Sequence, residues 1–364
     1  MADRAELNPW FVNKPKRGCN FFMNKVEYLF KEKSVPCYFD ASFSFLEELT
    51  DKKNAIIITD EHVYALHAAK FSGYCLIKFP EGEKYKNQQT VDYIIGELIK
   101  LGADKNTTLI GAGGGVVTDI TGYVAAVYMR GLNFGLVPTT ILAMVDAAVG
   151  GKNGINVGLY KNMLGTICQP EFIVYDYSFL RSLPANEWIN GFAEVIKHAC
   201  IKDEVLFAIL QRYSLHDFQT DETLMAELVE KNVKIKAEVV TADEFEKGNR
   251  KLLNFGHTIG HAIENLHLIP HGHAVSIGIV SACNLSEQLT GFHFEDAKKV
   301  VNLLARYHLP VDIETDHENV FEILKMDKKK TGNQVQFILL NKIGDAFIKP
   351  ISLEHLRRHL KEIL

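Results

Sequence analysis

A histidine-rich segment in the second half of the chain carries side chains well suited to chemistry. In NFGHTIGHAIE (254–264), His257 and His261 are four residues apart, so they share one face if the segment is helical. A glycine precedes each histidine and leaves room for a bulky neighbour. His271 and His273 follow shortly afterwards. Imidazoles gathered in this way can bind a metal ion or transfer protons.

A carboxylate and an amine lie upstream in GFAEVIKHAC (191–200), where Glu194 and Lys197 are three residues apart. One carboxylate and two imidazoles are the usual ligands of a catalytic zinc ion, which keeps further positions open for substrate oxygens. The spacing alone also allows the plainer interpretation that these histidines are hydrogen-bonded residues of the core or surface. A metalloprotease is disfavoured, because the segment lacks the glutamate of HExxH.

A run of glycines, GAGGG (111–115), follows an expected strand at 107–111 and precedes an expected helix at 116–128. Such a loop presents unpaired N–H groups and the positive end of a helix to a phosphate. The spacing departs from GxGxxG, so a tight strand-to-helix turn remains the alternative. A second pair of glycines, Gly150 and Gly151, precedes Lys152 and would also let the backbone come close to a ligand.

Basic residues recur around these segments. They are Lys152, Lys161, Lys197, Lys236, Arg250 and the run Lys328–Lys330. Most lysines belong to a solvated surface. Lys152 follows the glycine pair and Arg250 stands four residues before Asn254, so both lie close to the special motifs. A bound phosphate and a bound carboxylate would each need such partners.

The elements that must position these residues change in type along the chain. In the first half, short apolar runs alternate with helical patterns, which predicts a parallel sheet covered on both faces. The expected strands are 54–60, 74–79, 107–111, 134–138 and 172–176, and the expected helices are 61–70, 90–102 and 116–128. The second half is predicted to be mostly helical, with helices at 186–200, 222–240, 258–266, 274–289 and 297–307 and one hairpin at 334–340 and 345–351. We therefore predict an α/β fold with a Rossmann-like N-terminal domain at 1–184 and a mostly helical C-terminal domain at 185–364.

Composition excludes several classes of protein. The net charge of −5 gives no sign of the basic surface that binding to nucleic acid or an anionic membrane requires. The six cysteines form no CxxC pair, which argues against a zinc knuckle or a disulfide framework. No stretch has the apolar length of a signal peptide or a membrane span, so we expect a cytoplasmic protein.

Taken in order, these segments resemble the 3-dehydroquinate synthase family of sugar-phosphate cyclases, which acts in the shikimate pathway. The resemblance runs from about residue 60 to about residue 344. Its blocks are PEGEKYK (80–86), GGGVVTDITGYVAAVYMRG (113–131), VPTTILAMVDAAVGGKNGIN (137–156), KNMLG (161–165), GFAEVIKHA (191–199), KAEVV (236–240), RKLLNFGHTIGHAIE (250–264), HGHAVSIG (271–278) and DKK (327–329). The ordered set is far more specific than any one block.

The resemblance implies roles for residues at matching positions. The metal ligands would be Glu194, His257 and His271, binding zinc or cobalt. Contacts to NAD would come from Asp60, Glu83, Lys86, Gly114, Gly115, Val116, Asp119, Thr139, Thr140, Lys152, Lys161, Asn162, and Phe179 and Ser182 of the 179–182 turn. Substrate contacts and catalytic roles would come from Asp146, Lys152, Lys197, Lys236, Arg250, Asn254, His261 and one of Lys328 and Lys329, with Lys329 preferred. Arg130 resembles the arginine that such enzymes lend to the phosphate site of a neighbouring subunit, which implies a homodimer.

The reaction implied by the resemblance begins from 3-deoxy-D-arabino-heptulosonate 7-phosphate. The metal acidifies the hydroxyl that is oxidised, and NAD⁺ accepts the hydride. Phosphate is then eliminated, the hydride returns, the ring opens, and an intramolecular aldol step closes the carbocycle of 3-dehydroquinate. Lys152, Asn254 and His261 would orient the anionic groups and assist proton movement.

Three positions depart from the family pattern. His273 stands where an acidic residue is common, so it would alter the support of His271 or compete as a ligand. Asn153 and Ser182 each replace a frequent threonine, and neither change is expected to disable the site.

Other functions stay open. Sibling cyclases that make 2-deoxy-scyllo-inosose or valiolone-type products use substrates without the carboxylate, for which Arg250 is the expected partner. A metal-dependent polyol dehydrogenase of the glycerol dehydrogenase type shares the two-domain plan but would accumulate NADH. A non-catalytic binding protein would bind no divalent ion.

Overall fold

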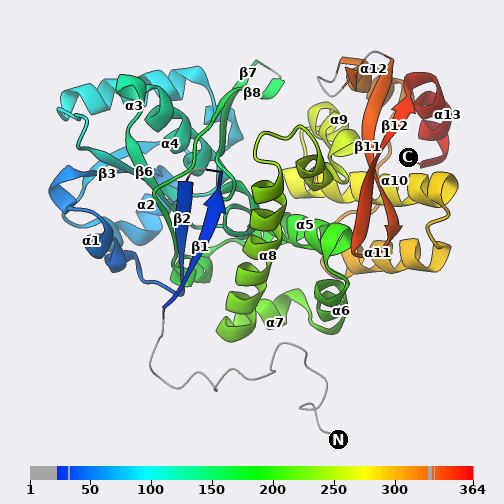
Figure 1. Cartoon of the computed structure of the whole chain (residues 1–364), viewed down its shortest axis with the longest axis horizontal. Coiled ribbons are helices and arrows are strands. Elements are labelled where there is room, and N and C mark those ends of the chain that lie inside the picture. Colours follow the sequence, from blue (N-terminus) through cyan, green and yellow to red (C-terminus); the bar gives the residue numbers. More distant parts are fainter. Residues whose placement is uncertain (1–22, 32, 159, 327–329, 332, 364) are drawn as a thin grey trace, which may run out of the picture.

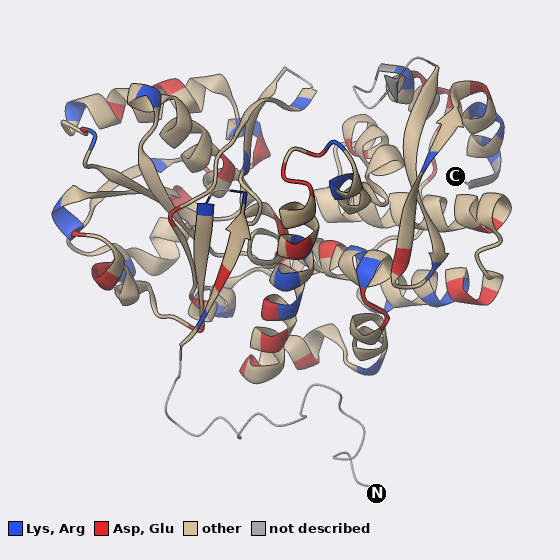
Figure 2. Cartoon of the chain, viewed as in Figure 1, with Lys and Arg blue, Asp and Glu red and all other residues tan. Residues whose placement is uncertain are grey.

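The structure is a computed structural model that describes residues 23–31, 33–158, 160–326, 330–331 and 333–363. Figure 1 shows an α/β part formed by the first half of the chain beside a mostly helical part formed by the second half. This arrangement confirms the predicted fold class. In Figure 2, acidic and basic residues are interspersed over both parts.

The α/β part is built on a seven-stranded sheet with the order β1-β2-β9-β6-β5-β3-β4. All neighbouring strands are parallel except the edge pair β1 and β2. The strands are β1 (Asn24–Phe30), β2 (Lys33–Phe39), β3 (Ala55–Asp60), β4 (Cys75–Phe79), β5 (Thr108–Gly113), β6 (Asn133–Pro138) and β9 (Phe172–Tyr175). Central strands such as β3, with the sequence AIIITD, are buried almost throughout because helices cover both faces.

The helices of this part begin at positions that the sequence marks well. They are α1 (Leu46–Leu49), α2 (Glu61–His67), α3 (Gln88–Lys100) and α4 (Gly115–Val127). The Asp60 side chain caps α2 and the Asn87 side chain caps α3, each by accepting a backbone N–H of the first turn. The residues between β6 and β7 form a short π-helical turn, η6 (Ala143–Ala147).

Two hairpins were not predicted from the sequence. One is β1–β2 at the edge of the main sheet, and the other is the separate pair β7 (Lys152–Val157) and β8 (Tyr160–Ile167). The β8 strand is mostly exposed, so its sequence lacks the alternation of buried and exposed positions that identifies a half-buried strand. The sequence analysis also missed four short helices, which are α6 (Glu204–Arg212), α7 (Leu215–Thr220), α12 (His317–Met326) and α13 (Leu353–Ile363).

The helical part packs its elements around a core that continues into the α/β part. Its elements are α5 (Ala185–Lys202), α6 (Glu204–Arg212), α7 (Leu215–Thr220), α8 (Glu222–Ala242), α9 (His257–His267), α10 (His271–Thr290), α11 (Phe294–Arg306), α12 (His317–Met326), β10 (Lys330–Thr331), β11 (Gln334–Lys342), β12 (Asp345–Ser352) and α13 (Leu353–Ile363). The predicted hairpin is confirmed as β11–β12. One hydrophobic cluster includes Met144 of η6 and Phe192 of α5, so both parts share it. The division at 184/185 therefore stays a prediction, although α5 does begin at Ala185.

No helix in the described part of the chain is long and apolar enough to cross a membrane.

Candidate metal and substrate site

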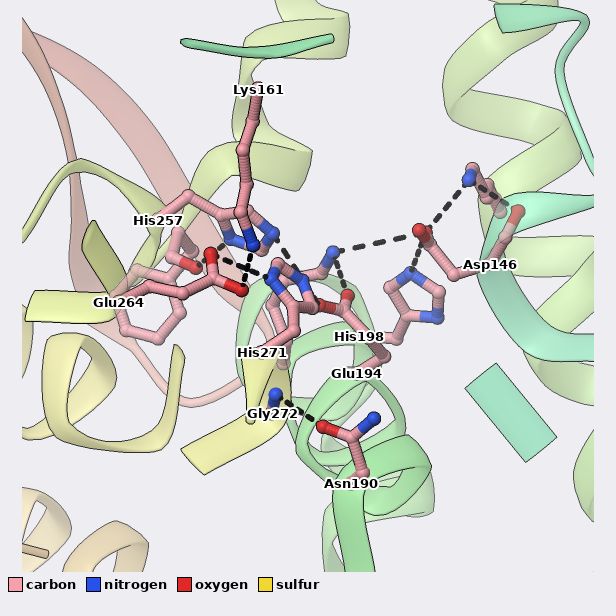
Figure 3. Close-up of polar contacts among 12 residues, drawn as sticks. Asp146, Lys161, Asn190, Glu194, His198, His257, Glu264, His271 and Gly272 are labelled. Carbon is pink, nitrogen blue, oxygen red and sulfur yellow. Dashed lines mark hydrogen bonds and ion pairs between the residues drawn. The ribbon is translucent and has the colours of Figure 1, made fainter. Parts of the chain in front are cut away.

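Three helices bring one carboxylate and two imidazoles together. Glu194 lies in the middle of α5, while His257 and His271 are the first residues of α9 and α10. Glu194 Oε1 lies 3.4 Å from Nε2 of His257 and 3.4 Å from Nε2 of His271. Figure 3 shows both rings directed at this carboxylate. The structure thus assembles the three side chains that the resemblance marked as metal ligands.

Glycines explain how α9 and α10 come close enough for this. Gly256 has φ +76°, and a Cβ on it would lie 2.6 Å from Ile279 Cγ1. A Cβ on Gly260 would lie 2.9 Å from the carbonyl oxygen of Ala274, and one on Gly278 would lie 1.9 Å from that of Gly256. Gly256 and Gly260 therefore make room for α10, which carries His271, and Gly278 of α10 makes room for the segment that begins α9.

The donor geometry fits a divalent ion. Ligand atoms of tetrahedral zinc lie about 3.3–3.4 Å apart, given bonds of about 2.0–2.1 Å, and Glu194 Oε1 lies 3.4 Å from each histidine nitrogen. His257 Nδ1 lies 3.1 Å from the carbonyl oxygen of Phe255, so Nδ1 carries the proton and the Nε2 lone pair faces Glu194. Glu194 Oε1 is buried and accepts no hydrogen bond among the described residues. A cation between these atoms would remove the repulsion between the His257 lone pair and the carboxylate.

The electrostatics of the donor set also favour a bound cation. Burial opposes the charge of Glu194, yet Lys197 and His257 hold the pKa of its carboxyl well below the ordinary value. Burial lowers the pKa of His257. For His271, burial is outweighed by Glu194 and Glu264, which raise the pKa to about 9. A divalent ion would replace the proton of His271, as metal binding requires deprotonated ligands.

A network of charges continues from Glu194 toward η6. The Lys197 ammonium pairs with Glu194 and lies 3.9 Å from Asp146 Oδ1. Lys236 Nζ lies 2.7 Å from the same Asp146 oxygen, and His198 Nε2 lies 3.7 Å from it. Burial would raise the pKa of Asp146, but Lys236 and Lys197 hold it well below the ordinary value. The structure therefore places three predicted substrate residues, Asp146, Lys197 and Lys236, beside the donor cluster.

A second group of predicted substrate residues surrounds Glu246. Lys152 Nζ pairs with one Glu246 oxygen, and Asn254 Nδ2 donates to the other over 2.7 Å. Arg250 is 2% exposed. Its guanidinium donates to the carbonyl oxygens of Glu244 and Gly150, the latter over 2.9 Å. Glu246 thus binds the ammonium of Lys152 and the amide of Asn254, which were predicted to bind a substrate anion.

The glycine loop lies at the N-terminus of α4. Gly114 is the N-cap, no side chain caps the helix, and its first turn has no acidic residue. A Cβ on Gly113 would lie 2.4 Å from Val117 Cγ2, so this position requires glycine. The first-turn N–H groups, beginning with those of Gly115 and Val116, are suited to an anion. This fits the pyrophosphate of a dinucleotide.

Other predicted cofactor residues cluster around the same helix. Asp119 of α4 lies 2.5 Å from Lys86 Nζ, which also donates to Asn162 Oδ1 over 2.7 Å. Thr140 Oγ1 accepts the backbone N–H of Ala143. The backbone N–H of Thr139 donates to Gly113.

Several residues that were predicted to contact NAD have side chains with partners inside the protein. Phe179 is 1% exposed and packs against Phe43 and His67. Ser182 Oγ lies 2.7 Å from His67 Nε2. Asp60 caps α2, and Glu83 accepts from Asn156 Nδ2 over 2.8 Å.

The predicted residues that the structure does not place at the site are Arg130, Lys328 and Lys329. Arg130 ends the short helix η5 (Tyr128–Arg130), beyond the far end of α4 from the glycine loop, and it is exposed. Lys329 and Lys328 lie outside the described residues. His261 does lie beside the donors, with ring centroids 5.2 Å from His257 and 6.0 Å from His271.

Sequence reasoning gave no role to two carboxylates that the structure places at the site. Glu264 Oε2 lies 3.4 Å from His271 Nδ1, and Glu264 Oε1 lies 2.5 Å from Lys161 Nζ. Glu264 stands three residues after His261, and this spacing on one helical face could have identified it. For Glu246, in a loop before η8 (Asn249–Asn254), no local signal existed. His273 belongs to none of the donor groups found among the described residues, so Glu264 is the residue that supports His271.

Comparison with known proteins defines the class first. The structure of 2-epi-5-epi-valiolone synthase from Streptomyces hygroscopicus superposes with a TM-score of 0.83 and 26% sequence identity, over 92% of this chain and 98% of that one. The fold is therefore that of the sugar-phosphate cyclases.

Sequence relatives then define the family. The model of the 3-dehydroquinate synthase N-terminal region matches residues 76–190, and that of the C-terminal region matches residues 191–330. The 3-dehydroquinate synthase of Campylobacter concisus is 40% identical over 314 residues, 84% of this chain and 90% of that protein. That of Pyrococcus furiosus is 42% identical over 288 residues, 79% of this chain and 84% of that protein. The chain belongs to the 3-dehydroquinate synthase family.

Proposed function

We propose that the chain is a 3-dehydroquinate synthase, which converts 3-deoxy-D-arabino-heptulosonate 7-phosphate into 3-dehydroquinate and phosphate. The observation that carries the proposal is the convergence of Glu194, His257 and His271, whose donor atoms lie within 4.8 Å of one another. Family membership supplies the reaction, and this cluster supplies a site able to perform it. The enzyme is an NAD- and metal-dependent carbon–oxygen lyase.

The cofactors are NAD and a divalent ion, zinc or cobalt. The valiolone synthase structure contains NAD⁺ and Zn²⁺, and the donor set here suits the same ion. When bound, the ion acidifies the substrate hydroxyl that is oxidised, and NAD⁺ takes up its hydride and later returns it. Glu194, His257 and His271 would hold the ion, while the first turn of α4 would hold the pyrophosphate of NAD.

The buried charges beside the donors orient the substrate. Burial opposes the charge of Lys197, but Glu194 and Asp146 raise the pKa of its amine, so it is an ammonium that donates to substrate hydroxyls. Asp146 accepts hydrogen bonds and is held by Lys236. His261, beside both histidine ligands, moves protons during ring opening and closure.

The anionic ends of the substrate bind at Lys152, Asn254 and Arg250. Lys152 and Asn254 already hold one carboxylate, that of Glu246, and would hold a substrate anion in the same way. Arg250 uses at least two N–H groups on carbonyls, and its fork of five N–H groups leaves capacity for the substrate carboxylate.

The homodimer implied by Arg130 is part of the proposal. The described side chains of the β7–β8 hairpin include five exposed apolar ones, at Val157, Tyr160, Met163, Leu164 and Ile167, each at least 40% exposed. Such a patch favours association with another chain. Light scattering should give twice the mass of one chain, and a monomeric mass with full activity would refute a shared site. We also propose a cytoplasmic location, because NAD and a sugar phosphate are charged and do not cross bilayers unaided.

Turnover tests the assignment of substrate. Purified enzyme with NAD⁺ and zinc should release phosphate from the heptulosonate 7-phosphate, and no net NADH should accumulate. Release from glucose 6-phosphate or sedoheptulose 7-phosphate alone would identify a sibling cyclase. Stoichiometric NADH without phosphate would identify a polyol dehydrogenase, and no bound ion or turnover would identify a binding protein.

A further inference from the structure

The ion pair of Lys161 and Glu264 connects β8 with α9. Lys161 Nζ lies 2.5 Å from Glu264 Oε1, and the Glu264 side chain is only 4% exposed. Figure 3 shows Lys161 reaching down to the carboxylate beside the histidine cluster. A buried carboxylate needs such a partner, because desolvation disfavours its charge. This contact therefore ties the exposed hairpin to the helix that carries His257.

The other oxygen of Glu264 faces the metal site. Glu264 Oε2 lies 3.4 Å from Nδ1 of His271, whose Nε2 faces Glu194. A carboxylate on the outer nitrogen of a ligand histidine sets the tautomer and the ring orientation. One carboxylate thus orients a proposed metal ligand with one oxygen and anchors the hairpin with the other.

The next residue of β8 connects to the cofactor side. Asn162 has φ +49°, and its Oδ1 accepts from Lys86 Nζ, which pairs with Asp119 of α4. Lys161 and Asn162 are consecutive, yet one contacts α9 and the other contacts the residues around the glycine-loop helix. The start of β8 is therefore in contact with both proposed ligand sites.

We propose that Glu264 is a positioning residue that, through Lys161, couples binding of the metal ion to binding of NAD. This inference rests on the proposed function, since it assumes that Glu194, His257 and His271 hold the ion. A bound ion holds the ring of His271 in one orientation, and that ring in turn orients the Glu264 carboxylate. Glu264 then holds Lys161, and with it the start of β8. NAD then binds to a hairpin that is already ordered, so each ligand tightens the other, reciprocally.

A linkage experiment on the full-length enzyme tests the proposal without measuring turnover. The affinity for NAD⁺ is determined by calorimetry on chelator-stripped protein and on Co²⁺-loaded protein. The affinity for Co²⁺ is determined from its visible absorption, with and without saturating NAD⁺. For the wild type, each ligand should tighten the other by the same factor, about fivefold or more. Absence of coupling in the wild type overturns the proposal.

Two variants locate the coupling. Lys161→Met removes the cation, while Glu264→Gln keeps an oxygen for His271 Nδ1 and loses the charge that holds Lys161. In both, and in the double variant, the coupling factor should fall to about one while Co²⁺ still binds. Lys299→Met, which breaks an exposed pair with Asp296, should keep the wild-type factor. Coupling that persists in both Lys161→Met and Glu264→Gln overturns the proposal, and so does loss of all Co²⁺ binding in folded Glu264→Gln, which would make Glu264 a ligand.

Failure of the metal site itself would look different. If Co²⁺ binds the wild type and Glu194→Gln with equal affinity, the proposed ligand set is wrong and the inference falls with it. If Glu194→Gln loses Co²⁺ while the Lys161 and Glu264 variants keep full coupling, the metal site stands and only the connection through Glu264 is refuted. Circular dichroism and thermal melts confirm that each variant is folded.

Discussion

His257 and His271 present Nε2 to the same oxygen of Glu194, while their Nδ1 atoms face Phe255 and Glu264. Each ring therefore has one nitrogen oriented by the protein and one directed at the shared center. Among the described residues, no donor bonds to the buried Oε1 of Glu194. Two histidines that only filled the core would not explain a buried carboxylate oxygen left in this way, because buried polar atoms normally have a hydrogen-bond partner. The arrangement makes the ligand set testable one residue at a time.

His257→Ala should abolish turnover and leave the NAD⁺ affinity of chelator-stripped protein largely unchanged, because the ring belongs to the donor cluster and not to the glycine loop. Metal affinity should fall by more than about 100-fold, since losing even an outer partner of a ligand costs 10–100-fold. Elemental analysis and calorimetry measure the two effects. His273→Ala is the matched control, and equal loss of metal and NAD⁺ affinity in His257→Ala would mean that the histidine is structural.

Glu246→Gln should tighten the binding of inorganic phosphate by about two- to fivefold, because the partly exposed pair with Lys152 must be broken before an anion can bind there. Calorimetric titration with phosphate measures this. Glu238→Gln is the control: it removes a surface carboxylate of α8 that pairs with Lys234, and it should leave the phosphate affinity unchanged. Unchanged or weaker phosphate binding in Glu246→Gln would show that Glu246 and the anion do not compete.

At the scale of elements, η8 holds Arg250 against two carbonyls, so the residue has a structural role beside its proposed contact with the substrate. Arg250→Lys should lower the free energy of unfolding by about 2–4 kcal/mol, because hydrogen bonds to charged groups contribute about 1.5–3 kcal/mol each. It should also raise the KM for the heptulosonate. Urea melts and steady-state kinetics measure the two.

Charge reversal at Arg250 is a poorer test, because it would bury a carboxylate beside carbonyl oxygens and unfold the segment. Arg357→Lys, at an exposed pair with Glu318, is the control and should leave both quantities unchanged. A stable Arg250→Lys enzyme with the wild-type KM would contradict both roles of Arg250.

Gly113 of the glycine loop and Gly96 of α3 allow a comparison of two Gly→Ala changes. Gly113→Ala should cost about 1–3 kcal/mol of stability and weaken NAD⁺ binding, because the new Cβ would lie 2.4 Å from Val117 Cγ2 at the start of α4. Gly96 lies in the middle of α3, and a Cβ added there would meet no atom within 4 Å. Gly96→Ala should therefore raise the free energy of unfolding by about 0.5–1 kcal/mol. Thermal melts and NAD⁺ titration decide, and equal effects of the two changes would refute the packing argument.

At the scale of the whole molecule, the donors come from the helical part and the glycine loop comes from the α/β part. The shared core holds α5 and η6 together, so the site is assembled only when both parts have folded. A metal ion bound by three helices should therefore stabilise the entire chain.

Removing the ion with a chelator should lower the thermal midpoint. An ion at about 100 times its Kd stabilises the native state by about 2.7 kcal/mol. Differential scanning calorimetry of stripped and zinc-loaded enzyme measures the shift. In Glu194→Gln the midpoint should no longer respond to zinc, and an undiminished response would place the stabilising ion elsewhere.

Much of the α/β part was predictable, because its strands are buried on both faces and read as apolar runs between helical patterns. The start of α5 and the hairpin β11–β12 were also predicted correctly. The hairpins β1–β2 and β7–β8 were not, since β1 and β8 are mostly exposed, and an exposed strand lacks the alternation of apolar and polar residues that identifies a half-buried one.

By itself the sequence determined the chemical types at the site: two histidines on one helical face, a glutamate and lysine on another, and glycines before a helix. Spacing within one helix is a local property, so these features could be identified without the fold. Only the tertiary structure decided that Glu194, His257 and His271 share a center, that Glu264 supports one of them, and that Glu246 holds Lys152 and Asn254. Those contacts join helices and loops distant in sequence, and their geometry is set by how the shared core packs.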